Sequence, residues 1–193
     1  MLLLLPLYLE RACDYTPFVA GCFLLIMTLF YSGSVIVGGK TVDRSGMWPV
    51  VSGGFLLMVV GLFATFFAAP TKTAWLVVLI GSVVVVGDAL INVPDKDVVL
   101  EALPDNAVPD TSAIFSTGNQ IAGSIGSALF VGVLSADALR QTAVGINRHA
   151  AYANGFQHSI LIAAIFEVVM LLVSVWYSRE MVRHGRAKIN QPA

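Results

Sequence analysis

Residues 17–38 read PFVAGCFLLIMTLFYSGSVIVG, and this stretch decides the fold. It contains no charged residue, and most of its side chains are apolar. A helix rises about 1.5 Å per residue, so a stretch of this length crosses the roughly 30 Å of hydrocarbon in a bilayer. Backbone groups in lipid must be hydrogen-bonded within the chain. The stretch therefore predicts a membrane-spanning helix.

Four further stretches have a similar length and an apolar character. They are residues 48–69, 74–94, 111–135 and 158–178. The connections between them are short, which makes neighbouring helices antiparallel. We therefore predict an all-α transmembrane bundle of about five full helices.

Residues 1–9 are also apolar, but they are too short to cross a bilayer alone. They lack the basic start and the small-residue cleavage site of a signal peptide. We interpret them as the last part of a longer helix, so that the chain begins in the middle of a larger structure.

The composition agrees with lipid as the surrounding solvent. Hydrophobic residues make up 57% of the 193 residues, charged residues 12%, and the mean hydropathy is +0.82. Soluble domains carry roughly 25% charged residues. The net charge of −1 leaves no broad basic face for nucleic acid. Cys13 and Cys22 lack metal-ligand spacing, and we expect neither a metal nor a cofactor.

Lysine and arginine predict the orientation, because cytoplasmic loops are enriched in them. Residues 179–193 form a basic tail, which predicts a cytoplasmic C-terminus in the plasma (inner) membrane. Antiparallel helices then place Lys40, Arg44 and Lys96 inside as well. The basic residues of the tail are Arg179, Arg183, Arg186 and Lys188.

The connection after residues 17–38 reads GKTVDRSGMWP over residues 39–49. Gly39 and Gly46 allow tight turns. Asp43 is close to the start of the next helix, where the helix dipole favours a carboxylate. Arg44 can pair with Asp43 or with lipid phosphate. From the residues alone, a well-capped turn explains the segment.

The spacing of Gly39, Asp43, Arg44 and Gly46 resembles the signature loop of the major facilitator superfamily. Three more segments resemble its fourteen-helix drug:proton antiporters, in the order of their C-terminal portion. They are LPLYL at 5–9, QIAGSIGSA at 120–128 and ANGFQ at 153–157.

The resemblance implies a proton-driven exporter of small amphipathic molecules that lies in a lipid bilayer. Such transport rocks two helical bundles about a midplane site. This chain supplies about one bundle, so we expect it to be inactive alone. The missing N-terminal helices would come from a longer parent or from a partner chain. The family loop usually continues with two basic residues, where this chain has Met47 and Trp48, which puts a charge-relay latch in doubt.

Asp88 and Glu167 are the acidic residues inside predicted spans, and intramembrane carboxylates mark pathways or proton sites by default. Asp88 lies roughly 21 Å along its helix, and Glu167 about 13 Å from either end of its own. Both are candidates for proton coupling or the transport pathway. The alternatives are a local pair of Asp88 with Lys96 and a structural role for Glu167.

Four polar residues inside spans are candidates for lining a substrate cavity: Tyr31, Asn92, Asn119 and Gln120. The common use of such amides is hydrogen bonding between helices. Gly123 with Ser127 forms a small-x-x-x-small pair, which we interpret as close helix packing.

Two other functions stay open at this point. The chain could be a non-transporting membrane protein, accessory to other subunits or a decayed remnant. An enzyme would need a polar catalytic cluster, and the sequence shows no such pattern.

Overall fold

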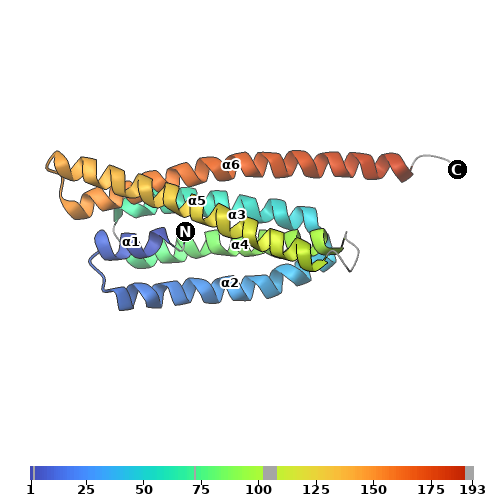
Figure 1. Cartoon of the computed structure of the whole chain (residues 1–193), viewed down its shortest axis with the longest axis horizontal. Helices are drawn as coiled ribbons and strands as arrows, with labels where there is room; N and C mark the ends of the chain where they lie inside the picture. Colours follow the sequence, from blue (N-terminus) through green and yellow to red (C-terminus); the bar gives the residue numbers. More distant parts are fainter. Residues whose placement is uncertain (2, 72, 102–107, 190–193) are drawn as a thin grey trace.

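The computed structural model shows a bundle of long helices that run side by side (Figure 1). It describes residues 1, 3–71, 73–101 and 108–189, and the side chains of these ranges except 93–101 and 178–189. The helices are α1 (Leu4–Arg11), α2 (Pro17–Ser45), α3 (Met47–Ala68), the 3₁₀ turn η1 (Ala69–Thr71), α4 (Ala74–Glu101), α5 (Val108–Ala143) and α6 (Arg148–Ile189). Within these ranges, α2 to α6 are long and apolar enough to cross a membrane. The predicted all-α bundle is confirmed, with a short first helix before five long ones in the described residues.

Several hydroxyl groups inside the spans are satisfied by their own helices. The Thr28 hydroxyl donates to the Leu24 carbonyl at 2.9 Å, and the Ser34 hydroxyl donates to the Phe30 carbonyl at 2.7 Å. These bonds reach back one turn, and they spare a lipid-facing helix the cost of an unpaired polar group. Serine and threonine therefore fit into these spans without a partner helix.

The helices extend beyond the predicted spans. α2 continues from residue 38 to Ser45, and α6 begins at Arg148, ten residues before the predicted 158. The predicted connection 136–157 shrinks to residues 144–147. Hydropathy marks where the bilayer ends, whereas a helix ends where the backbone must turn. Residues 102–107 and 190–193 of the predicted connection and tail lie outside the described residues.

Helix α1 is short but lies in the core. The Tyr8 hydroxyl donates to the Ala69 carbonyl at 2.9 Å, and the Tyr8 ring packs on Phe156 with centroids 4.5 Å apart. Leu5 and Leu9 are fully buried. The contacts tie α1 to the end of α3 and to α6, so the partial helix is an integral part of the bundle.

Helices α3 and α4 cross at backbone contact. A Cβ atom at Gly87 would lie 2.6 Å from the Gly54 carbonyl oxygen and 2.6 Å from Cγ of Met58. A Cβ atom at Gly61 would lie 2.7 Å from Val84. Small residues allow this close approach, which supplies much of the packing between helices in lipid. α4 is thereby fixed against α3 immediately before Asp88.

Helices α2 and α5 are the least covered spans. Within their most apolar windows, 17% of α2 and 11% of α5 is buried, against 50% of α4. Along α5, no described atom lies within 4 Å of a Cβ built at Gly118, Gly123, Gly126 or Gly132. Helix α4 is therefore central, while α2 and α5 flank it with open faces.

A single residue, Gly46, separates α2 from α3. Its φ of +81° and ψ of 164° belong to a region that only glycine adopts easily. We expect Gly46→Ala to destabilise the chain by about 1–3 kcal/mol, measured by denaturant unfolding in detergent. Gly39→Ala is the matched control, because Gly39 is helical with open space around it. An equal loss in both variants would contradict this account of Gly46.

Candidate functional site

A cavity of about 350 Å³ lies between α1, α3, α4 and α5. Its wall is mainly apolar, with Leu4, Met58, Val84 and Phe130 among the residues that form it. Asp88 is the only ionisable side chain among its described lining residues. A mostly apolar cavity with few polar groups is the usual form of a small-molecule site.

Asp88 projects from α4 and is held by its neighbour one turn on. The Asn92 Nδ2 donates to Asp88 Oδ1 at 2.8 Å and to the Asp88 backbone carbonyl at 3.1 Å. The structure thus brings two of the sequence candidates into contact. Asn92 holds the carboxylate and is not among the described residues that line the cavity. The Lys96 side chain, considered as a local partner for Asp88, lies outside the described side chains.

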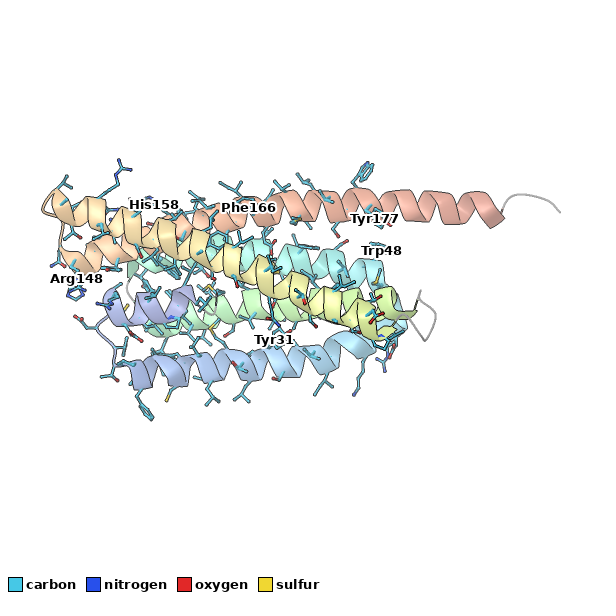
Figure 2. All side chains as sticks on the ribbon, viewed as in Figure 1. Tyr31, Trp48, Arg148, His158, Phe166 and Tyr177 are labelled. Atoms are coloured by element: carbon cyan, nitrogen blue, oxygen red, sulfur yellow. The ribbon has the colours of Figure 1, made fainter. Side chains whose placement is uncertain are left out.

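Tyr31 and Glu167 belong to the same electrostatic neighbourhood. The charge of Asp88 acts on the Tyr31 phenol and on the Glu167 carboxyl. Tyr31 is half-buried on α2, packed against the core (Figure 2). No described residue hydrogen-bonds to Glu167, which is half-buried on α6. These two groups, on α2 and α6, therefore lie within electrostatic range of Asp88 on α4.

Asn119 and Gln120 lie on α5 and are exposed. Gln120, Gly123 and Ser127 are spaced i, i+3 and i+7, so they share one helix face. Gly123 and Ser127 line the cavity, and the two amides continue this face toward the start of α5. Gly123 packs against no described helix, because a Cβ there meets open space, so the interpretation of Gly123 and Ser127 as a packing pair stays a prediction. The spacing was correct, but a small residue does not reveal whether a partner faces it.

The signature-loop residues lie at the end of α2, separate from the cavity. Gly39 is inside α2 and forms no turn, whereas Gly46 makes the single break. Asp43 and Arg44 are exposed in the last turn of α2, and neither has an ion-pair partner among the described side chains. α3 begins without a side-chain cap, so the expected carboxylate at its start is not present. Helix α2 simply continues through the segment.

Some lining residues carried no sequence signal. Met58 and Phe130 contact the cavity, yet methionine and phenylalanine are equally common on lipid-facing and core surfaces. The Asp88–Asn92 contact did have a signal, since residues four apart on a helix are neighbours.

An apolar groove of about 590 Å³ also lies between α2 and α4 and includes Phe30, Gly33 and Leu90.

Comparison with known proteins places the chain. The sequence profile of the Major Facilitator Superfamily matches residues 1–127. A lincomycin resistance protein, LmrB, of Listeria monocytogenes is 30% identical over an alignment of 186 positions, which covers 91% of this chain and 38% of that protein. An uncharacterized MFS-type transporter of Bacillus subtilis, YcnB, is 32% identical, over 89% of this chain and 36% of its own length.

More distant relatives have similar names. A multidrug resistance protein B homolog of Mycobacterium tuberculosis is 26% identical over 66% of this chain and 24% of its own length. No solved structure matches. The chain spans less than half the length of these relatives. With the family profile covering most of its length and five apolar helices in place, the chain is an integral membrane protein that belongs to the major facilitator superfamily.

Proposed function

We propose that this chain is the C-terminal portion of a proton-coupled exporter of small amphipathic molecules. The cavity carries this proposal, because its apolar wall suits an amphipathic molecule and Asp88 has the one ionisable side chain among its described lining residues. Carboxylates at membrane depth are costly and are retained where protons or ions pass. The proposal is transport and not catalysis, in keeping with relatives named as transporters and resistance proteins.

The rest of the transporter would cover the open faces of α2 and α5. These faces flank α4 and the cavity, and glycines on α5 have free space around them. Helices in lipid associate through such small-residue faces. The covering helices would come from a longer parent or from a partner chain, and they would complete the wall of the cavity. Gln120 and Asn119 would then face substrate or the covering helices.

A chimaera tests this proposal. The aligned segment of the Listeria lincomycin resistance protein, 38% of that protein, would be replaced by this chain. Bacteria lacking their own exporter should accumulate less labelled lincomycin with the chimaera, and an uncoupler of the proton gradient should remove the difference. The chain expressed alone should give no export, because its cavity lacks the opposing bundle. Export by the chain alone would contradict the proposal. A membrane-inserted but inactive chimaera would favour the non-transporting alternative.

The proposed orientation has the C-terminus in the cytoplasm of the plasma (inner) membrane. Arg148 lies at one end of the bundle, whereas Trp48 and Tyr177 pack together toward the other, with ring centroids 5.0 Å apart (Figure 2). Basic residues after Tyr177 favour the cytoplasmic side for that end. A cysteine at residue 146, in a chain with Cys13 and Cys22 replaced by serine, should react with an impermeant thiol reagent in intact cells. A cysteine at Ser45 should react only after the membrane is opened, and the reverse pattern would refute the orientation.

A further inference from the structure

Four polar side chains join α5 to α6 near the 144–147 turn. Asp137 and Gln141 lie one turn apart on α5, and Asn154 and His158 lie one turn apart on α6. The Asn154 Nδ2 donates to Gln141 Oε1 at 2.7 Å, and the Gln141 Nε2 donates to Asp137 Oδ2 at 2.8 Å. The His158 Nδ1 lies 2.6 Å from the same Asp137 oxygen. We call these four residues the α5–α6 clasp.

The directions of these hydrogen bonds fix the state of His158. An ionised Asp137 only accepts, so His158 Nδ1 must carry a hydrogen and donate it. The neutral ring then leaves Nε2 without a proton, and no described residue hydrogen-bonds to Nε2. The His158 side chain is 53% exposed, so water can deliver a proton there. Protonation converts a neutral hydrogen bond to Asp137 into a charge-assisted one, which is roughly twice as strong.

The other charged and titratable groups near this end have partners elsewhere or face solvent. His149 lies 3.4 Å from Asp14 and 3.2 Å from the Arg11 carbonyl oxygen. Arg148 lies over the Tyr152 ring at 5.8 Å. From α1 and α5, Glu10 is half-buried and Arg140 is exposed, and neither has an ion-pair partner among the described residues. The side chain of Lys72, after η1, lies outside the described residues.

The clasp lies beside the tightest contact between α5 and α6. A Cβ atom at Gly155 would lie 2.5 Å from the Leu134 carbonyl oxygen, and the Ser159 hydroxyl donates to the Phe130 carbonyl at 3.0 Å. Phe130 also lines the cavity. Beyond this crossing, the first part of α5 is mostly exposed, and α5 has few contacts with any helix other than α6.

From this geometry we propose that protonation of His158 controls how strongly the α5–α6 clasp holds the two helices together. Protonation of His158 tightens the joint to Asp137, and loss of the proton weakens it. Histidine changes charge between about pH 5 and 8, so the joint responds to the pH of the solution at this end of the bundle. The clasp thereby adjusts the tilt of α5 beside the cavity, a consequence that rests on the proposed function. The pH response of the joint itself does not rest on the proposed function.

A double-mutant cycle on this chain in detergent tests the joint without any transport assay. The cycle compares the wild type with His158→Gln, Asp137→Asn and the double variant by thermal unfolding. Glutamine still donates a hydrogen bond but takes up no proton. The non-additive part of the midpoint shift should be about twofold larger near pH 5.5 than near pH 8. The control cycle of His149→Gln with Asp137→Asn should be additive at both pH values, because His149 pairs with Asp14.

A non-additive part that is equal at both pH values would overturn the proposal, as would equal coupling in the control cycle. If a variant fails to fold, nitrogen NMR of ¹⁵N-histidine in the wild type decides the matter. His158 Nδ1 should stay protonated across the range while Nε2 titrates, and a proton that leaves Nδ1 instead would refute the assignment. If the chimaera is inactive but the joint still responds to pH, the result would reject the proposed exporter function and leave the proposal for the α5–α6 clasp standing.

Discussion

Replacing Asp88 by Asn should reduce proton-dependent export by the completed transporter to background. Asparagine has nearly the same shape, and its Oδ1 can still accept the hydrogen bond from Asn92, which measures 2.8 Å in the wild type. It cannot carry a negative charge or release a proton. The cavity would keep its volume and its apolar wall but lose the one ionisable side chain among its described lining residues. Accumulation of labelled lincomycin in cells that express the chimaera measures the effect.

The control for Asp88 is Asp110→Asn, in the exposed first turn of α5, which should export normally. Both variants should be present in the membrane at the level of the parent. Proton-dependent export by Asp88→Asn would exclude Asp88 from coupling. If Asp88→Asn instead removes the protein from the membrane, the residue has a structural role. Glu167→Gln in the same assay shows whether the second carboxyl of this neighbourhood is needed.

The second large effect is expected at Gly87, where α4 meets α3. An alanine Cβ would lie 2.6 Å from the Gly54 carbonyl oxygen and 3.0 Å from the Met58 backbone nitrogen. Backbone atoms cannot move aside as a side-chain end can, so the two helices must separate. Overpacking of this kind costs about 1–3 kcal/mol, and it would shift Asp88, the next residue. We therefore expect Gly87→Ala to lower the unfolding free energy and export together.

Gly53→Ala is the matched control for Gly87. Gly53 lies on α3 beside Gly54, but a Cβ there meets no described atom within 4 Å. Replacing a helical glycine by alanine in open space should raise stability by about 0.5–1 kcal/mol. Denaturant unfolding in detergent compares the variants. Equal stability of Gly87→Ala and Gly53→Ala would mean that the α3–α4 crossing is looser than described.

The spans were predictable because charge depletion is a direct response to lipid. Residues 17–38 and 48–69 needed only their composition to be identified as helices. Their ends were less predictable, since Lys40, Asp43 and Arg44 follow the uncharged stretch but still belong to helix α2. Of the two glycines in the 39–49 segment, Gly46 interrupts the helix and Gly39 does not, and only the backbone angles distinguish them.

Among the candidates for the pathway and the substrate cavity, only Asp88 lines the described cavity. Tyr31, Asn92, Asn119, Gln120 and Glu167 are not among its described lining residues. Asp88 and Asn92 stood out because polar groups are rare inside spans. The tight glycine contact was expected on α5, yet it lies between Gly54 and Gly87 on α3 and α4. A glycine in a sequence does not show which helix it faces. The α5–α6 clasp had a usable signal, since Asp137 with Gln141 and Asn154 with His158 each lie four residues apart.

The one-residue link at Gly46 has a consequence for how the protein is made. Only Gly46 links Ser45 at the end of α2 to Met47 at the start of α3. With so short a link, we expect α2 not to enter the bilayer before α3. We expect the two segments to insert together as a helical hairpin, and the proposed orientation would keep Lys40 and Arg44 on the cytoplasmic side. Lengthening the link would let the first segment insert alone, which exposes it to turnover before its neighbour arrives.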